Sequence, residues 1–394
     1  RWHRFINPSH LTPSPMNNSL LFLSNLLLRA CRPIPFAKHI IPMLMAAFLL
    51  SPSLLIARTG KGLKHAYRNS FDVGVGLNLR NVTVKGQRDL IVANFSTATA
   101  ENAMKPASVQ PREGVFTWEA ADSIANFCRR NGLKMRGHCL CWHNQFADWM
   151  FVDSMGNPVS KEVFYERLRT HIHAVVNRYK DVVYAWDVVN EAIADGPDTI
   201  SCPYRITRHY RLCGDEFIVR AFEYAHEADP NALLFYNDYS TVDPAKRDRI
   251  VNMLRKLRQQ GAPIHGLGMQ AHYNIYWPDR ALLETAIEAF SRVVDVIHIT
   301  EMDVRASHEH GGQLTFSQGT SLVPDSVTLS RFDRQYRMLF EVFRRHSNLI
   351  RNVTFWNLSD NDSWIGAANY PLLFDKEYRP KPTYFSVRDL GRSR

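Results

Sequence analysis

The chain has 394 residues, 45% of them hydrophobic and 22% charged, so it can bury the core of one large domain or of two to three ordinary ones. This composition excludes a disordered, collagen-like or disulfide-scaffold protein. The formal net charge of +10 would by itself favour nucleic acid or an anionic membrane as a partner. However, residues 1–71 hold nine Lys and Arg and no acidic residue, which leaves 39 basic against 38 acidic residues in the remainder. Because the bulk of the chain is nearly neutral, we expect no nucleic-acid partner.

The basic end of the chain has the pattern of an export leader. Several basic residues precede a mostly apolar run at 40–56, which is followed by Ala57, and this order is typical of a secretory signal. Two prolines interrupt the run, and it is shorter than the about 20 apolar residues of a membrane span. We predict that 1–57 is a removed leader, that 58–394 is the mature domain, and that the protein is secreted or periplasmic without stable membrane insertion. A single membrane-anchor helix is the alternative.

The six cysteines do not form a disulfide framework, because one lies in the leader and an odd five remain. Cys202 and Cys213 could pair in an oxidising compartment. Cys139 and Cys141 lie two positions apart on a predicted strand and have histidines nearby, but no paired metal-binding motif accompanies them. We interpret these two as small buried hydrophobic residues and expect neither a metal ion nor a cofactor.

Short apolar runs alternate along the chain with longer segments whose apolar residues recur at helical spacing. The runs predicted as strands are 72–79, 90–98, 133–141, 182–189, 232–237, 265–271, 293–299 and 352–358. Most of them are continuous rather than alternating, which suits parallel strands covered on both faces. Eight such units predict an α/β fold, a single (β/α)₈ TIM barrel. A doubly wound open sheet is the alternative, but no glycine-rich nucleotide-binding motif follows the first strand.

Two glutamates follow apolar runs on opposite sides of this predicted barrel. Glu191 follows the fourth strand and Glu301 follows the seventh. Active sites of such barrels lie at the carboxyl ends of the strands, so both carboxyl groups belong at the mouth. Glycoside hydrolysis needs such a pair, because one acid protonates the leaving oxygen while one carboxylate acts at the anomeric carbon. Trp142, Trp356 and Trp364 follow other strands and could stack on sugar rings, which indicates a carbohydrate cleft.

These motifs resemble glycoside hydrolase family 10, whose best-known members are endo-1,4-β-xylanases. The similar segments, in chain order, are ENAMK at 101–105, GHCLCWH at 137–143, WDVVNE at 186–191, NDY at 237–239, GMQAHY at 268–273, ITEMD at 299–303, the run 354–364 and PLLFD at 371–375. The two segments that contain the glutamates make the resemblance specific.

The resemblance implies a role for each residue near the point of cleavage. Glu301 would be the nucleophile and Glu191 the general acid/base of a retaining reaction, and Asn190 would bind the 2-hydroxyl of the sugar. His272 would bridge Glu301 and Asp303, orient the nucleophile and keep it ionised. The negative charge of Glu301 would help to raise the pKa of Glu191, so that Glu191 can donate a proton.

The resemblance also implies which residues hold the substrate. Tyr239 would face the acceptor side of the cleft. The donor-side residues would be Glu101, Asn102, Lys105, His138, Trp142, Gln270, Trp356 and Trp364, next to Asn190 and His272. The resemblance implies an endo-1,4-β-xylanase that cuts internal bonds of xylan. Together with the leader this predicts a secreted enzyme, and we expect it to be a monomer. The alternatives are a related retaining glycanase acting on β-glucan or aryl glycosides, and a non-catalytic carbohydrate-binding barrel.

Overall fold

The computed structural model describes residues 62–196, 202–306 and 324–393. The leader predicted at 1–57 lies outside these residues. No helix within the described ranges is long and apolar enough to cross a membrane.

Eight parallel strands form a closed barrel. They are β1 (Asp72–Leu77), β2 (Thr97–Ala100), β3 (Lys134–Trp142), β4 (Val183–Asn190), β5 (Leu233–Asp238), β6 (Gly266–Met269), β8 (Val296–Arg305) and β9 (Ile350–Phe355). The strand order is β6-β5-β4-β3-β2-β1-β9-β8, and pairing of β6 with β8 closes the ring. The short strand β7 (His272–Asn274) also pairs with β8, beyond the end of β6. The barrel predicted from the sequence is therefore confirmed.

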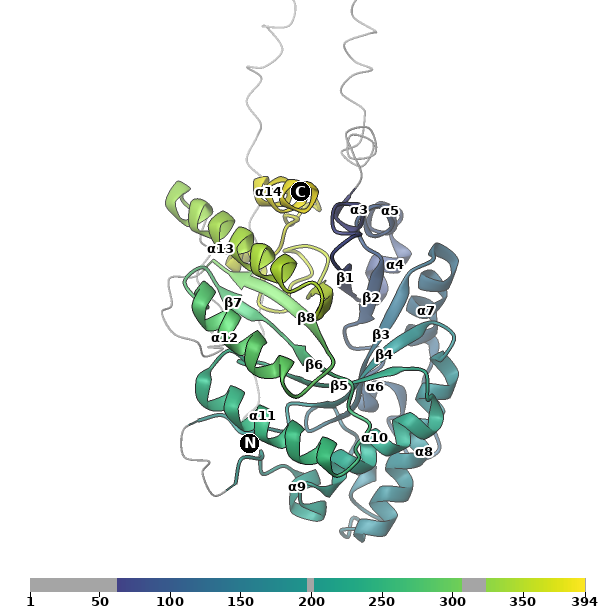
Figure 1. Cartoon of the computed structure of the whole chain (residues 1–394). Coiled ribbons are helices and arrows are strands. Elements are labelled where there is room, and N and C mark those ends of the chain that lie inside the picture. Colours follow the sequence, from purple (N-terminus) through teal and green to yellow (C-terminus); the bar gives the residue numbers. More distant parts are fainter. Residues whose placement is uncertain (1–61, 197–201, 307–323, 394) are drawn as a thin grey trace, which may run out of the picture. The chain divides into compact units, whose positions relative to one another are not determined.

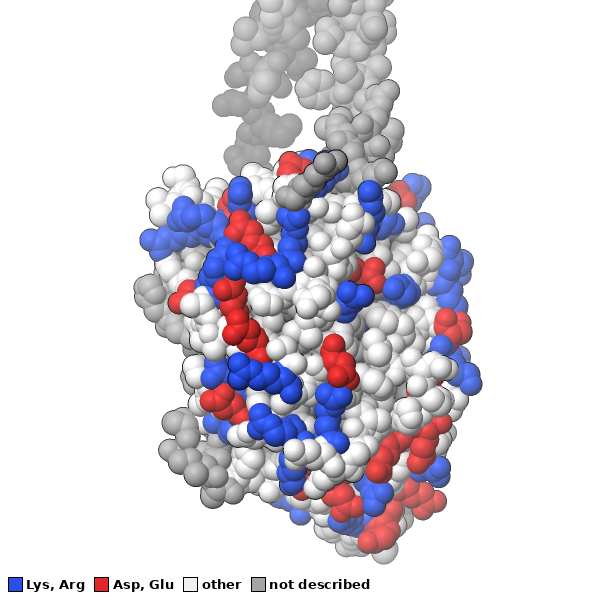
Figure 2. All heavy atoms as spheres, in the orientation of Figure 1, with Lys and Arg blue, Asp and Glu red and all other residues white. Residues whose placement is uncertain are grey.

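A layer of helices surrounds these strands (Figure 1). The long helices are α5 (Lys85–Asn94), α7 (Glu119–Asn131), α8 (Lys161–Tyr179), α10 (Glu216–Ala228), α11 (Pro244–Gln259), α12 (Arg280–Ser291), α13 (Ser326–Arg345) and α14 (Pro382–Arg392). The shorter ones are α3 (Leu63–Ala66), α4 (Leu79–Thr83), α6 (Pro106–Val109) and α9 (Arg208–Cys213), with 3₁₀ turns η1 (Asp148–Met150) and η2 (Ala367–Asn369). On the face shown in Figure 2, acidic and basic side chains are interspersed over the outer helices.

Side-chain caps fix where several of the outer helices begin. Asp243, Asp279 and Asp325 each accept a hydrogen bond from a backbone N–H in the first turn of α11, α12 and α13, respectively. Each of these helices then buries an apolar face, as in α13, where Phe332, Tyr336 and other residues at helical spacing are fully buried. The caps and apolar faces together place each following strand in the barrel.

The second predicted strand is partly wrong. The sequence predicts a strand over 90–98, but α5 extends to Asn94 and β2 covers only Thr97–Ala100. Leu90 and Ile91 are buried together with polar residues one turn away on the same face of α5. A short apolar run does not distinguish a strand from the buried face of a helix. The other seven predicted strands overlap the observed ones.

All five described cysteines are free thiols, so the pairing of Cys202 with Cys213 that the sequence left open is not present. The Cys202 thiol lies 3.3 Å from the Tyr210 hydroxyl instead. Cys139 and Cys141 are buried, in agreement with their interpretation as packing residues. The described residues include no cluster of three or more His, Cys, Asp or Glu that could hold a metal ion.

Candidate active site

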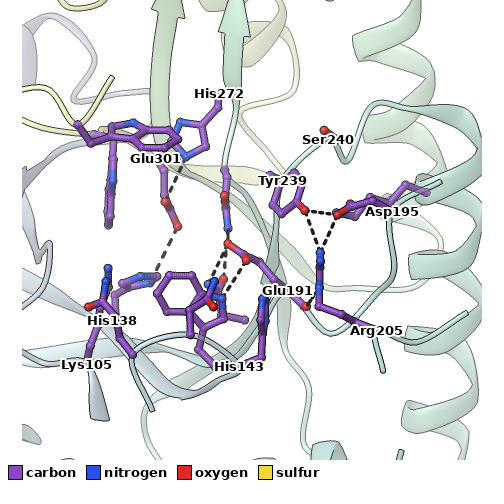
Figure 3. Close-up of a pocket in the computed structure, with 18 of the residues that line it drawn as sticks. Lys105, His138, His143, Glu191, Asp195, Arg205, Tyr239, Ser240, His272 and Glu301 are labelled. Atoms are coloured by element: carbon purple, nitrogen blue, oxygen red, sulfur yellow. Dashed lines mark hydrogen bonds and ion pairs between the residues drawn. The ribbon is translucent and has the colours of Figure 1, made fainter. Parts of the chain in front are cut away.

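The two predicted catalytic glutamates lie at the same end of the barrel and line one cavity of about 860 Å³ (Figure 3). Glu191 directly follows β4, and Glu301 lies within β8. Glu191 has a φ of 57°, a left-handed conformation that is uncommon for a residue with a side chain and is often found at functional sites. The cavity is also lined by every residue predicted to bind sugar: Glu101, Asn102, Lys105, His138, Trp142, Asn190, Tyr239, Gln270, His272, Trp356 and Trp364.

Hydrogen-bond donors hold the Glu301 carboxylate on both oxygens. Asn237 Nδ2 donates to Oε1 over 2.7 Å, and His272 Nε2 lies 3.3 Å from Oε2. Burial alone would raise the pKa of Glu301, but the hydrogen bond from His272 and the nearby ring of His138 outweigh it, and the pKa is lowered. Glu301 is therefore ionised at neutral pH, as a nucleophile must be.

His272 joins Glu301 to Asp303. Its Nδ1 lies 2.9 Å from Asp303 Oδ2, and the two carboxylates outweigh burial and raise the pKa of His272 to about 10. The ring is therefore protonated and donates from both nitrogens. Trp364 Nε1 donates to the same Asp303 oxygen over 2.8 Å, and the Trp364 ring lies against His272 with centroids 4.9 Å apart. This arrangement matches the predicted bridge and adds the Trp364 indole to it.

Glu191 has the opposite electrostatic environment. Burial raises its pKa, and the charge of Asp238 raises it further, more than that of Glu301 does. Hydrogen bonds from Gln270 Nε2 to Oε1 (3.0 Å) and from Trp142 Nε1 to Oε2 (2.8 Å) oppose this shift but do not reverse it. A carboxyl group with a raised pKa can hold a proton near neutral pH and donate it. The predicted direction is correct, but Asp238 is the larger of the two carboxylate contributions.

A buried ion pair supports the donor side of the cavity from inside the barrel. Arg136 Nη2 lies 2.6 Å from Asp187 Oδ1, and both side chains are almost fully buried. Asp187 Oδ2 in turn accepts a hydrogen bond of 3.0 Å from His138 Nδ1. Arg136 and His138 outweigh the burial of Asp187 and lower its pKa, so the carboxylate stays charged. Asp187 thus orients His138, whose ring lines the cavity.

The first turn after β2 brings further polar groups to this side. Lys105 Nζ donates to Asn102 Oδ1 over 2.8 Å and lies 4.9 Å from the centre of the Trp142 ring. Burial raises the pKa of the neighbouring Glu101. Charged and amide groups are suited to bind sugar hydroxyls, and an aromatic face is suited to stack on a sugar ring.

Comparison with known proteins identifies the family. A family model described as glycosyl hydrolase family 10 matches residues 62–390. The chain belongs to this family. It is 56% identical over 339 residues to an endo-1,4-β-xylanase/feruloyl esterase of Xylanibacter ruminicola, an alignment that covers 84% of this chain and 47% of that protein. It is 42% identical over 333 residues to endo-1,4-β-xylanase B of Paenibacillus barcinonensis, covering 82% of this chain and 97% of that protein.

The family 10 assignment also agrees with solved structures. A psychrophilic glycoside hydrolase family 10 endo-β-1,4-xylanase matches with a TM-score of 0.80 at 51% identity, covering 84% of this chain and 99% of that one. The chain thus spans about half the length of the Xylanibacter relative and nearly all of the other two proteins. The resemblance inferred from the sequence is confirmed.

Sequence reasoning missed several residues of this family 10 site. Asn237 and Asp238 stand in a segment that carried the resemblance, but neither was assigned a role next to a glutamate. Asp195, Arg205 and Lys246 line the cavity together with Tyr239, the only residue predicted to face an acceptor sugar. Asp238 is the last residue of β5, just as Glu191 directly follows β4. Its position at a strand end could therefore have indicated that Asp238 lies near the site. The other three lie in loops or early in a helix, where no local pattern marks them.

Proposed function

We propose that this chain hydrolyses internal β-1,4-xylosidic bonds of xylan with retention of configuration, with Glu301 as nucleophile and Glu191 as general acid/base. The observation that carries the proposal is the pair of carboxyl groups, one directly after β4 and one within β8, whose pKa values are shifted in opposite directions. Both of the curated relatives described above and the solved structure bear the name of an endo-1,4-β-xylanase. The prediction of this enzyme class is confirmed by these similarities, and the roles of individual residues are proposals.

The first step transfers the donor sugar to the enzyme. The Glu301 carboxylate attacks the anomeric carbon, and the bond from that carbon to the glycosidic oxygen breaks. Glu191 gives its proton to this oxygen, so the acceptor chain leaves as an alcohol. Asn190 accepts hydrogen bonds on Oδ1 from Asn237 and Gln270, which fixes its Nδ2 group toward the substrate and toward Glu191. This group is suited to bind the 2-hydroxyl as charge develops on the ring.

The second step releases the sugar. Once Glu301 is esterified its negative charge is lost, which lowers the pKa of Glu191 and lets it act as a base. Glu191 takes a proton from water, the water oxygen attacks the anomeric carbon, and the bond to Glu301 breaks. The product therefore keeps the β configuration, and both glutamates return to their starting protonation states.

The remaining parts of the proposal concern the form in which the protein works. The basic and apolar pattern before Ala57 supports export with removal of the leader, and the near-neutral remainder argues against a nucleic acid as partner. The exported domain would act on xylan as a monomer. N-terminal sequencing of the protein recovered outside the producing cell checks the cleavage point, and light scattering checks the mass. Retention of residues 1–57 on a membrane fraction would contradict this part.

Proton NMR of the first products tests the reaction itself. Xylohexaose should give β-anomers first, internal cleavage should dominate, and β-glucan should be a much poorer substrate. The kcat of Glu301→Ala should be lower than that of wild type by at least about 10³-fold, because the nucleophile is lost. Its melting temperature should be unchanged, because the substitution removes no core packing. Release of α-anomers first, preference for β-glucan or near-normal turnover by Glu301→Ala would overturn the proposal.

A further inference from the structure

The cavity beyond Glu191 is lined by charged side chains that the mechanism above does not use. We call this surface the acceptor wall and define it by Asp195, Arg205, Tyr239, Lys246 and Arg249. Figure 3 shows three of them on the side of Glu191 away from Lys105 and His138. Because Glu191 protonates the leaving sugar, the acceptor wall faces the part of the xylan chain that departs. What it binds therefore affects which xylan chains are cut.

Most charges of the acceptor wall are already paired. Asp195 Oδ2 accepts from Arg205 Nη2 and Asp195 Oδ1 from Lys246 Nζ, each over 2.9 Å, and the Tyr239 hydroxyl also donates to Asp195. Lys246 lies in addition 2.8 Å from Asp238 Oδ1. Burial would raise the pKa of Asp195, but Lys246 and the other donors outweigh it and lower the pKa to about 2. Arg205 and Lys246 thus both lie beside the ionised carboxylate of Asp195.

Arg249 differs from these two cations. It lies in α11 and is partly buried, and its Nη2 donates to the backbone oxygen of Ala194 over 3.0 Å. Its Nε is buried without an acceptor. Among the described residues, no carboxylate lies within 4.0 Å of its guanidinium, although it lines the same cavity as Glu191. A partly desolvated guanidinium without a counter-charge is an unfavourable arrangement unless a ligand supplies one.

The other titratable groups that line this part of the cavity do not match the charge of Arg249. Burial and the nearby cations lower the pKa of His143 to about 4, so this ring is neutral near pH 7. Asp243 is exposed and uses Oδ1 to accept the backbone N–H of Lys246 at the start of α11. Asp243 is thus the N-cap residue of α11, and this role accounts for its carboxylate without a contact to Arg249.

We propose that Arg249 binds the carboxylate of a uronic acid branch carried by the acceptor-side part of the xylan chain. This inference rests on the proposed function, because the acceptor side is defined by the direction in which Glu191 donates its proton. A guanidinium forms planar, charge-assisted hydrogen bonds with a carboxylate, whereas the neutral hydroxyls of unbranched xylan offer it no counter-charge. The acceptor wall would then select acidic xylan over neutral xylan at its leaving end.

The test compares two variants on two substrates. Arg249→Gln removes the charge and keeps an amide of similar length, and Arg247→Gln is the matched control, because Arg247 lies on the same helix, pairs with Asp248 and does not line the cavity. The substrates are unbranched xylohexaose and a xylo-oligosaccharide with one glucuronic acid branch. We expect kcat/KM of Arg249→Gln on the acidic substrate to fall about 10- to 100-fold, the range for a lost hydrogen bond to a charged group. On xylohexaose it should stay within about twofold, since no contact with the neutral chain is removed.

Chemical reduction of the glucuronic acid to glucose provides a ligand of the same size without the charge. Wild type and Arg249→Gln should cut this reduced substrate equally well, and Arg247→Gln should match wild type throughout. Equal losses on the acidic and neutral substrates would show that Arg249 only supports Ala194, and no loss on the acidic substrate would show that it binds no carboxylate; either result overturns the inference. If wild type fails to cut xylohexaose, the proposed function itself is wrong, so the two failures are distinguishable.

Discussion

Asn237 Nδ2 donates a hydrogen bond of 2.7 Å to Glu301 Oε1, from a strand that is separated from the nucleophile's strand by β6. The orientation of this amide is fixed, because Thr300 Oγ1 donates to Asn237 Oδ1 over 2.7 Å. Gly268 on the intervening strand leaves the necessary space, since a Cβ there would lie 2.2 Å from Asn237 Oδ1. The nucleophile is thus held by a side chain whose donor end can point only one way.

Replacing Asn237 should weaken the nucleophile. Asn237→Asp exchanges the donor for a second carboxyl group beside Glu301, so the pKa of Glu301 should rise and the acid limb of kcat/KM should move to higher pH. We expect kcat/KM near neutral pH to fall about 10- to 100-fold, as for other hydrogen bonds to charged groups. A pH–rate profile on xylohexaose measures both effects. Thr300→Val, which removes only the hydrogen bond that orients Asn237, should reduce kcat/KM less. An unshifted acid limb in Asn237→Asp would contradict the role of Asn237.

Asp238 should set the alkaline limit of activity. Glu191 must be protonated to act as an acid, so activity is lost as the pH rises through its pKa. Asp238→Asn removes a negative charge that raises this pKa, so the pKa should fall and the alkaline limb should move to lower pH. The exposed Asp295, which pairs with Arg258 on the surface, provides Asp295→Asn as a control that leaves the profile unchanged. An unchanged alkaline limb in Asp238→Asn would show that burial and the charge of Glu301 raise the pKa of Glu191 without Asp238.

Trp364 should act on catalysis through its indole N–H. Trp364→Phe keeps an aromatic ring beside His272 and removes one of the two donors to Asp303 Oδ2. We expect kcat to fall about tenfold, the lower end of the range for a hydrogen bond to a charged acceptor, with a smaller change in KM. Trp149→Phe is the matched control, because Trp149 Nε1 donates to the Gln110 backbone oxygen and does not line the cavity. Equal effects of the two substitutions on kcat would argue against a role through Asp303.

The sequence allowed the barrel and the catalytic pair to be predicted because both depend on local patterns. Glu191 directly follows β4 and Glu301 lies within β8, and each glutamate closes an apolar run that is visible in the sequence. The extent of β2 could not be predicted, since Leu90 and Ile91 fit either a strand or a helix face. The partner of Lys246 could not be predicted either, because Asp195 is 51 positions away and the pairing depends on how the loop after β4 meets the first turn of α11.

A second buried ion pair holds the loop that carries Trp364. Lys381 Nζ lies 2.6 Å from Asp360 Oδ2 and donates to the backbone oxygen of Tyr370, while Asp360 Oδ1 accepts the Leu372 N–H over 2.9 Å. Asp360 and Lys381 are only 2% and 3% exposed. Burial outweighs their mutual attraction, so the pKa of Asp360 is raised to about 6 and that of Lys381 is lowered to about 8. The pair therefore fixes the loop at an energetic cost.

Replacing one member of this pair should lower the free energy of unfolding far more than replacing both. Lys381→Met leaves a buried carboxylate without its cation and should lower the free energy of unfolding by about 3–5 kcal/mol at pH 8. Because the folded-state pKa of Asp360 is raised above its unfolded value, the folded state binds the extra proton, so the loss should shrink as the pH falls to 5. Asp360→Asn combined with Lys381→Met keeps the acceptor for Leu372 and should recover most of the stability. Urea unfolding at both pH values measures these differences, with Lys85→Met in the exposed pair with Asp89 costing at most about 1 kcal/mol as the control. A double variant no more stable than Lys381→Met would contradict the argument.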